Sequence, residues 1–314
     1  MDNRRSFIKK SSLSLAALTL PTAGITACAS AIPAEPFAPR KPEKALVFWY
    51  SQTGNTARTG KVIARELERR GLMVDSGEYR EIDRDSVGRY DFVVAGSPVY
   101  YYDVPENFQT WLGTLPDIKD IPVASYVTFG GEGGNFHNTA CTLLERLHAR
   151  GGIPVGWNAF GNMSAFAPTW SYGNVKRVLK FKHKPDQESF AAMRKFASTI
   201  LTRVQAGQSV DVDRECNFRE MIKSKPSIWG TKLLIDRHTI DKDRCVGCGT
   251  CLEKCPVGAI DLNAYQVDRD RCLLCMGCVN NCPAGAVDMV FMGKKVYGYY
   301  EFLKRNNITV ADPV

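Results

Sequence analysis

The stretches CVGCGTCLEKCP, residues 245–256, and CLLCMGCVNNCP, residues 272–283, contain eight of the eleven cysteines of this 314-residue chain. Both have the spacing C-x2-C-x2-C-x3-C-P. A disulfide framework spreads its cysteines to join distant segments, whereas cysteines three residues apart on a tight loop point at one centre. A structural zinc needs four thiolates, commonly from two C-x2-C pairs. Each run instead has three closely spaced thiolates and a fourth beside a proline, and this spacing predicts iron–sulfur clusters.

The two runs in tandem resemble bacterial ferredoxins that hold two [4Fe–4S] clusters, over the whole of residues 241–291. The resemblance implies that the fourth cysteine of each run serves the cluster of the other run. Carried over position by position, the ligands of one cluster are Cys245, Cys248, Cys251 and Cys282, and those of the other are Cys272, Cys275, Cys278 and Cys255. The segments GAIDL and GAVDM follow the two runs at matching places, so we expect two repeated halves with Ile260 and Val287 packed over the clusters.

The chain between residues 44 and 207 alternates apolar runs with helical periods. Segments with the spacing of helices are residues 56–71, 105–115, 136–152 and 186–207. Nearly continuous apolar runs, typical of buried parallel strands, are residues 45–51, 91–99, 122–130 and 154–161, with a shorter candidate at 73–79. The alternation predicts an α/β fold built on a doubly wound parallel sheet, followed by a small α+β domain around the cysteine runs.

A polar turn, SQTGNTA (residues 51–57), follows the first predicted strand and opens a helix. A helix N-cap alone would explain its hydroxyls, but backbone N–H groups and the helix dipole also suit a phosphate there. The turn resembles the phosphate loop of flavodoxins, [ST]-x-T-G-N-T, and the resemblance extends with decreasing sharpness over residues 44–207. It implies bound FMN, whose phosphate contacts Ser51, Thr53, Gly54, Asn55 and Thr56.

Two further loops fall at the carboxyl ends of predicted strands, where ligands bind in doubly wound sheets. GSPVYYYDVP (96–105) resembles the first flavin loop of flavodoxins and implies contacts from Pro98, Tyr100 and Tyr101, with Tyr102 as a third tyrosine able to stack on the flavin ring. TFGGEGGNFH (128–137) matches the second flavin loop in position and glycine content. There we expect contacts from Phe129, Gly130 and Gly131.

Two segments depart from the flavodoxin pattern. Residues 162–174 form an aromatic insertion after the fifth strand, whose Trp170 and Tyr172 either line the flavin, face the ferredoxin domain or pack in a small core, the reading we favour. Residues 208–240 form a basic connector of unassigned role, and residues 292–314 a C-terminal tail. Cys141 lies in a helical pattern and is expected in the core.

The N-terminus begins with RRSFIKK (residues 4–10), followed by an uncharged stretch to residue 30. A charged start, an apolar middle and a small-residue end indicate a secretory signal. The twin arginines resemble the twin-arginine export signal, with Asn3 where Ser or Thr is usual, and this implies export of the folded protein. The alternative is an ordinary signal with two arginines by chance. Clusters assembled in the cytoplasm favour folded export, because unfolding would expose eight thiols to an oxidising compartment.

The predicted signal comprises residues 1–27. The four residues ITAC (25–28) at its end resemble a lipobox, with Cys28 as the lipidated N-terminus. Simple cleavage after Ala29 is the alternative. Residues 28–43 have a proline at every third position from Pro33 to Pro42, which predicts a stiff polyproline II tether. We therefore expect a periplasmic protein, anchored by lipid to the outer side of the cytoplasmic membrane.

Net charge is +8, with 41 Lys and Arg against 33 Asp and Glu. The basic run KRVLKFKHK (176–184) is either a solvated helix face or a dock for anionic lipid or an acidic redox partner. The sequence has no recognisable nucleic-acid motif and no G-x-G-x-x-G after a strand for a dinucleotide. We therefore predict an electron carrier that passes electrons between FMN, the two clusters and a partner protein. The alternatives are a reductase of a quinone or other small acceptor, with His137 as its acid, and a non-catalytic sensor or assembly subunit.

Overall fold

The computed structural model describes residues 31–312. The predicted signal peptide and Cys28 lie outside this range. The larger domain contains a five-stranded sheet in the order β3-β2-β4-β5-β6, with every neighbouring pair parallel. Its strands are β2 Lys44–Trp49, β3 Met73–Glu78, β4 Phe92–Pro98, β5 Pro122–Gly130 and β6 Ile153–Asn162. The doubly wound parallel sheet predicted from the alternating pattern is confirmed.

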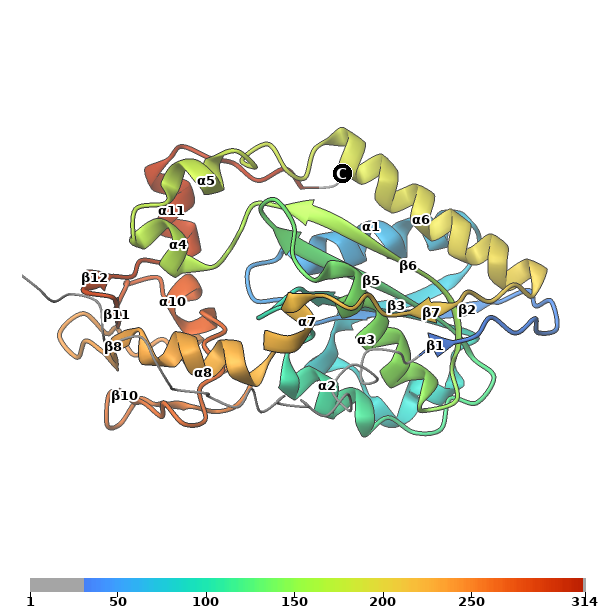
Figure 1. Ribbon diagram of the computed structural model, residues 1–314, viewed down its shortest axis with the longest axis horizontal. Helices are drawn as coiled ribbons and strands as arrows, with labels where there is room; N and C mark the ends of the chain where they lie inside the picture. Colours follow the sequence, from blue (N-terminus) through green and yellow to red (C-terminus); the bar gives the residue numbers. More distant parts are fainter. Residues whose placement is uncertain (1–30, 313–314) are drawn as a thin grey trace, which may run out of the picture.

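Helices cover both faces of this sheet (Figure 1). One face packs against α1 (Asn55–Arg69) and α6 (Gln187–Ala206), and the other packs against α2 (Glu106–Gly113) and α3 (Phe136–His148). Two short 3-10 turns, Tyr79–Glu81 and Arg84–Arg89, connect β3 to β4. The resulting layers bury β2, β4 and β5 almost completely, as their apolar composition requires.

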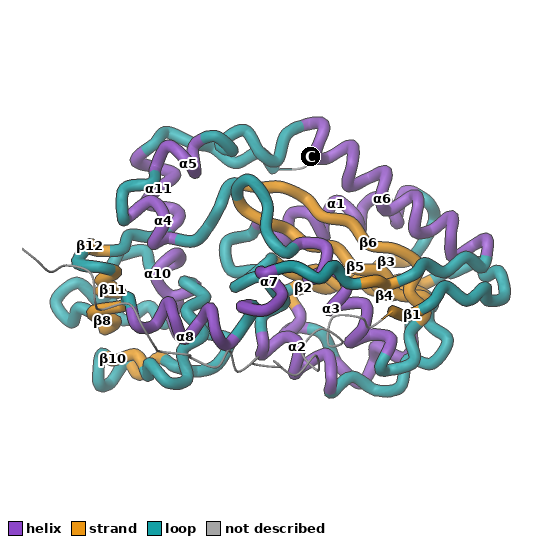
Figure 2. Tube along the Cα trace, viewed as in Figure 1, coloured by secondary structure: helices purple, strands orange, loops and turns teal. Residues whose placement is uncertain are grey.

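The second domain contains a smaller antiparallel sheet in the order β12-β11-β8-β10-β9 (Figure 2). Its strands are β8 Ile235–Ile240, β9 Ile260–Asp261, β10 Gln266–Val267, β11 Val287–Phe291 and β12 Lys294–Lys295. Its helices are α9 Thr250–Lys254, α10 Gly277–Asn281 and α11 Tyr299–Arg305. The small α+β domain is thus present, with β9 and β11 at matching places after the two cysteine runs.

The second domain is larger than the predicted 241–291. Strand β8 begins at Ile235, inside the predicted connector, because Ile235, His238 and Ile240 are buried against β11. The predicted C-terminal tail contributes β12 and α11, and Phe302 is fully buried in the same core. The domain boundary therefore lies near residue 235, and the tail completes the domain.

The aromatic insertion after β6 packs on this second domain. It forms α4 (Ala167–Ser171) and α5 (Val175–Leu179), which lie beside α11 in Figure 1. Trp170 is buried, its ring lies 4.6 Å from that of Phe302, and its Nε1 donates to the Tyr297 carbonyl at 2.9 Å. Tyr172 remains exposed and meets the edge of Phe291. The insertion joins the two domains through a shared core.

The described part of the Pro-rich segment does not extend as a tether. Strand β1 (Ala31–Ile32) pairs antiparallel with β7 (Val212–Asp213). Phe37 N donates to the Gly207 carbonyl at 3.0 Å, and Phe37 packs on the core beneath α6. The expected stiff spacer is therefore wrong for residues 31–43, because these hydrogen bonds fix the segment along the end of the larger domain.

The predicted connector contains several short elements of secondary structure. After β7 it forms α7 (Phe218–Ile222) and α8 (Lys225–Leu233) before entering β8. Figure 1 shows β7, α7 and α8 following one another from the larger domain toward the smaller one. No helix among residues 31–312 is both long and apolar enough to cross a membrane.

Candidate functional site

A cavity of about 530 Å³ lies between the two domains, at the carboxyl ends of the parallel strands. This volume is within the range of small-molecule and cofactor sites, about 300–1,000 Å³. The residues around it come from the turn after β2, the loops after β4, β5 and β6, helix α8 and the second cysteine run. The switch point of the doubly wound sheet lies between β2 and β4, because the chain continues from these two neighbours in opposite directions along the sheet, and the turns after both strands line this cavity.

The turn after β2 forms one wall. Gly54 has φ 84°, a left-handed conformation that glycine adopts without strain, and it caps α1 at Asn55. Thr53 and Thr56 are buried, and the Thr56 hydroxyl lies 2.8 Å from that of Thr128 at the end of β5. The first N–H groups of a helix lack intrahelical partners, so this wall offers donors to an anion.

The tyrosine turn after β4 forms a second wall. Tyr101 and Tyr102 have positive φ angles of 45° and 64°, unusual for bulky residues. The backbones of Tyr100 and Asp103 exchange two hydrogen bonds across this turn, at 2.7 and 3.0 Å. The rings of Tyr100 and Tyr101 meet at right angles with centroids 4.9 Å apart. Strained backbone of this kind persists only where its surroundings hold it.

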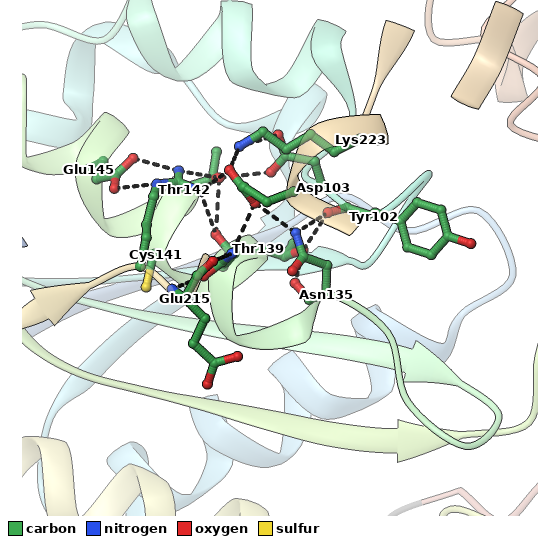
Figure 3. A network of polar contacts seen from close by, with 12 residues as sticks. Tyr102, Asp103, Asn135, Thr139, Cys141, Thr142, Glu145, Glu215 and Lys223 are labelled. Carbon is green, nitrogen blue, oxygen red and sulfur yellow. Dashed lines mark hydrogen bonds and ion pairs between the residues drawn. The ribbon is translucent and has the colours of Figure 1, made fainter. Parts of the chain in front are cut away.

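A polar network behind the turn holds it in place (Figure 3). The buried Asp103 carboxylate accepts from Thr142 of α3 at 2.7 Å and lies 3.8 Å from the Lys223 ammonium. Asn135 donates to the Tyr102 carbonyl at 2.9 Å and to Glu220 of α7 at 2.8 Å. The network therefore fixes the tyrosine turn and ties the connector to the larger domain.

A second part of this network belongs to the connector itself. Arg214 forms ion pairs with Glu145 at 2.6 Å and Glu220 at 2.9 Å, and Lys223 also pairs with Glu220. Arg214 and Glu220 are largely buried, and breaking one partner of a buried pair is costly. The connector is thus held rigidly where it passes the cavity.

Most residues predicted to contact FMN line this one cavity. They are Ser51, Thr53, Asn55, Thr56, Pro98, Tyr100, Tyr101, Phe129 and Gly130. Gly54 and Gly131 do not line it. His137 does not line it either, because its Nε2 lies 2.6 Å from the Asp213 carbonyl in β7.

Sequence reasoning missed other lining residues. Three further segments face the cavity. They are residues Asn162 to Phe166 of the insertion, Ile222, Ser227, Gly230, Thr231 and Leu234 of the connector, and Cys275, Met276 and Asn280 of the second cysteine run. No motif marked these positions as flavin contacts, because they reach the cavity only through the packing of one domain on the other.

The cavity walls contain polar atoms that lack partners. The Ser51 hydroxyl and the side-chain oxygens of Gln52 and Asn162 are buried without a hydrogen-bond partner. Leaving such an atom unpaired costs about 1–3 kcal/mol. A ligand with both a phosphate and a ring edge of donors and acceptors can satisfy them, and FMN has both. The residues present therefore fit FMN.

The eight cysteines gather into two groups, each drawn from both runs. Cys245, Cys248, Cys251 and Cys282 surround one small void together with Val287. In the other group, burial, opposed by the backbone N–H of Gly277 and helped by the neighbouring Cys272 and Cys255 thiols, raises the pKa of Cys275 to about 12. Burial raises the pKa of the Cys278 thiol well above its usual value, and the neighbouring Cys275, Cys272 and Cys255 thiols shift it in the same direction.

Hydrogen-bond donors surround these sulfurs. The backbone N–H groups of Ala259 and Ala286, at equivalent places after the two runs, donate to Cys255 Sγ at 3.1 Å and Cys282 Sγ at 3.2 Å. His238 Nε2 lies 3.6 Å from Cys278 Sγ. Burial, with a smaller effect of Arg269, lowers the pKa of His238 to about 4, so the ring is neutral.

The cysteine groups differ from both alternatives considered for them. None of the ten cysteines in the described part of the chain forms a disulfide. Among residues 31–312, no three His, Cys, Asp or Glu side chains come close enough together to hold a single metal ion. Two four-cysteine groups with N–H donors to sulfur, and with buried thiols whose ionised form needs a compensating positive charge, fit [4Fe–4S] clusters.

Two contacts join the cavity directly to the second cysteine run. Asn281 Nδ2 donates to the Gln52 carbonyl at 3.0 Å. Gln52 lies in the turn after β2, residues 51–57, which we call the phosphate turn. Gly277 lies so close to Gln52 that an added Cβ would come within 2.3 Å of Gln52 Oε1. The turn after β2 and the loop around Cys275 are therefore in contact.

Comparison with known families agrees with this geometry. Residues 46–143 match a flavodoxin domain. Residues 238–261 and 266–287 each match a 4Fe-4S binding domain. FMN and two iron–sulfur clusters are thus the cofactors, and the chain is an electron-transfer protein that combines a flavin with iron–sulfur clusters.

Several solved flavodoxins are similar to the larger domain. Oxidised Flavodoxin 2 from Bacillus cereus is 19% identical, with 51% of this chain and 99% of that chain covered and a TM-score of 0.40. A Streptococcus pneumoniae flavodoxin is 16% identical over the same shares, also with a TM-score of 0.40. An archaeal flavodoxin is 16% identical, covering 52% and 99%, with a TM-score of 0.38. No curated protein matches the chain.

Proposed function

We propose that this protein relays electrons between FMN in the interdomain cavity, the two clusters and a partner protein. Bound FMN exchanges one or two electrons, whereas each [4Fe–4S] cluster exchanges one. The cluster ligands are the exchanged sets, Cys245, Cys248, Cys251 and Cys282 for one cluster and Cys272, Cys275, Cys278 and Cys255 for the other.

The observation that carries the proposal is Cys275 in the wall of the flavin cavity. Its group is the more deeply buried one, with Cys272 and Cys278 buried, whereas Cys248 of the other group is exposed. The order cavity, Cys275 group, Cys248 group and surface therefore supports a relay with its outer end at the surface around Cys248.

The protein's own residues define this path. The tyrosine turn, the phosphate turn and α8 enclose the flavin site, while Asn281 and Gln52 hold the second domain against it. His137, the acid predicted for a small-acceptor reductase, contacts β7 and does not line the cavity. The geometry therefore favours transfer within the chain over reduction of a small molecule.

A single-turnover experiment tests the relay. Under anaerobic conditions the flavin of the holoprotein is photoreduced, and flavin and cluster absorbance are followed separately. We expect cluster reduction to follow flavin reduction without any added mediator. Clusters that stay oxidised, although redox titration shows their potentials to lie above that of the flavin, would contradict the relay. Fast turnover of a quinone without any partner would favour the reductase instead.

The proposal places the relay outside the cytoplasm, exported in its folded state. The motivation is Arg4 and Arg5 in a chain that carries eight cluster-spaced cysteines. Replacing both arginines by lysine keeps the charge, and cofactor-loaded protein should then accumulate in the cytoplasm. Normal export of the lysine variant would refute the assignment. Cys28→Ala tests lipidation, because it should release the protein from membrane fractions.

A further inference from the structure

The connector helices α7 and α8 expose large apolar side chains. Phe218 and Met221 lie three residues apart on α7 and are 70% and 75% exposed. Trp229 and Leu233 lie four residues apart on α8 and are 66% and 65% exposed. Residues three or four apart share one face of a helix. Each helix therefore presents a pair of apolar side chains to solvent, which is uncommon unless the face binds something.

The opposite side of α8 is already occupied. Ile228 is buried, and Ser227, Gly230 and Thr231 line the flavin cavity. The apolar residues Trp229 and Leu233 are therefore not needed for folding this helix onto the protein. Helix α8 therefore has one side toward the flavin cavity and another, with Trp229 and Leu233, toward solvent.

The same segment is basic. Residues 217–234 contain four basic side chains and a single carboxylate, Glu220, which is paired with Arg214 and Lys223. Arg219 is exposed, and the Lys225 side chain is 83% exposed although it lies 3.6 Å from a Glu106 oxygen. A short helix with Trp and Leu on its outer face and basic residues beside them is the composition of a segment that lies in a membrane interface. Trp in particular prefers the headgroup level.

The start of the described chain pairs with β7, the strand that leads into this segment. Ala31 pairs with Asp213 in β7, and α7 begins at Phe218, five residues later. Cys28 precedes Ala31 by three residues in the sequence, and three residues span at most about 10 Å. A lipid on Cys28 would therefore enter a bilayer near β7, the strand after which α7 and α8 follow in the chain.

From these observations we infer that α7 and α8 form a membrane-docking surface for an anionic lipid bilayer, with Phe218, Met221, Trp229 and Leu233 entering the interface. This rests on the proposed location at a membrane, but its test does not depend on export or on electron transfer. Docking would place the outer side of the flavin-cavity wall against the bilayer.

Vesicle binding by the purified holoprotein tests the inference. The full chain with Cys28→Ala, which cannot be lipidated, is compared with the same chain carrying Phe218→Ser, Met221→Ser, Trp229→Ser and Leu233→Ser. We expect the fourfold variant to partition into phosphatidylglycerol-containing vesicles at least about tenfold more weakly. Arg219→Gln with Lys225→Gln should weaken binding to these vesicles and leave binding to neutral phosphatidylcholine vesicles unchanged.

A matched control and a local readout keep the test specific. Met73→Ser removes a methionine that is 64% exposed on β3, away from the connector, and should leave partition unchanged. Brominated lipid should quench the part of the fluorescence that Trp229→Phe removes. Retained flavin and cluster absorbance shows that each variant is folded.

Three results would overturn the inference. They are unchanged vesicle partition of the fourfold variant, no quenching of Trp229 by brominated lipid, and a concentration-dependent dimer that the fourfold variant alone loses. The last would assign the surface to a second copy of this chain. None of these results bears on flavin-to-cluster transfer, so the proposed relay is tested separately.

Discussion

Tyr50, which follows β2, and Cys275, in the second cysteine run, line the same cavity although they belong to different domains. Tyr50 is buried, and its hydroxyl accepts a hydrogen bond from Gln52 Nε2 at 3.1 Å. Gln52 in turn contacts the loop that holds Cys275, through its carbonyl and Asn281. The flavin site and one cysteine group are thus parts of one continuous structure, and this arrangement leads to the following predictions.

Exchange of the fourth ligands predicts which cluster each cysteine variant damages. We call the cluster of Cys245, Cys248, Cys251 and Cys282 the outer cluster, and that of Cys272, Cys275, Cys278 and Cys255 the inner cluster. Cys282 lies with the other three cysteines of the outer group, so Cys282→Ser should convert the outer cluster to a three-iron species. The flavin should still reduce the inner cluster, but transfer to an external one-electron acceptor should be lost. Electron paramagnetic resonance and single-turnover absorbance measure the two effects.

Cys255→Ser provides the control for this assignment of ligands. Cys255 lies near Cys272, Cys275 and Cys278, so Cys255→Ser should damage the inner cluster and stop reduction of the outer one by the flavin. If each variant instead damages only the cluster of its own run, the exchanged assignment is wrong.

The phosphate turn predicts a loss of FMN affinity. Thr53 and Thr56 are buried at the cavity, and each lost hydrogen bond to a charged group costs about 1.5–3 kcal/mol. Thr53→Ala together with Thr56→Ala should therefore raise the FMN dissociation constant by about 100-fold or more, with both clusters intact by spectroscopy. Thr59→Ala is the matched control, because Thr59 is equally buried one turn later on α1 and does not line the cavity. Equal FMN affinity in both variants would refute the phosphate site.

Local patterns in the sequence predicted the sheet, its helices and nine of the residues that line the interdomain cavity. Strand β5 was predicted at residues 122–130, its observed bounds, because a buried parallel strand is almost wholly apolar. Ser51 to Thr56 were identifiable because a turn that opens a helix has a local chemical signature.

Contacts between the domains could not be predicted in the same way. Thr231 of α8 and Cys275 reach the cavity only because Trp170 packs against Phe302 and Asn281 bonds to Gln52. Those pairs are far apart in the chain, and no local pattern records them. Ile235 was assigned to the connector because the periodic burial of β8 is visible only after β11 is paired with it.

The contact of His238 with Cys278 predicts a shift in one cluster potential. His238 Nε2 lies 3.6 Å from Cys278 Sγ, and its Nδ1 is buried without a partner, so the ring proton belongs on Nε2 and points at the sulfur. A hydrogen bond to a ligand sulfur stabilises the more negative, reduced cluster. His238→Phe keeps the buried ring and removes this bond, so the potential of the inner cluster should fall.

The size of the shift follows from the strength of one hydrogen bond. A net contribution of about 0.5–1.5 kcal/mol corresponds to roughly 20–65 mV for a one-electron couple. Redox titration monitored by electron paramagnetic resonance measures it. The outer cluster is the internal control, because His238 does not contact its ligands. Equal shifts of both clusters, or none, would contradict the assigned role.

The contact between Gly277 and the phosphate turn predicts a variant that separates the two redox sites while both remain loaded. A Cβ at position 277 would come within 2.3 Å of Gln52 Oε1 and 3.0 Å of the Lys254 carbonyl. Lys254 lies in α9 of the same domain as Gly277, so the clash with Gln52 is the one that acts between the two domains. Gly277→Ala should therefore push the second domain away from the turn, at a cost of about 1–3 kcal/mol in the free energy of unfolding.

The expected result is slower flavin-to-cluster transfer with unchanged redox potentials and unchanged FMN affinity. Single-turnover absorbance gives the rate, and thermal unfolding gives the loss of stability. Gly113→Ala is the matched control, because a Cβ at position 113 at the end of α2 would meet no atom within 4 Å. A Gly277→Ala rate equal to that of the Gly113→Ala variant, despite the lost stability, would show that electrons do not pass across this contact. Electrons would then have to leave the flavin through another wall of the cavity.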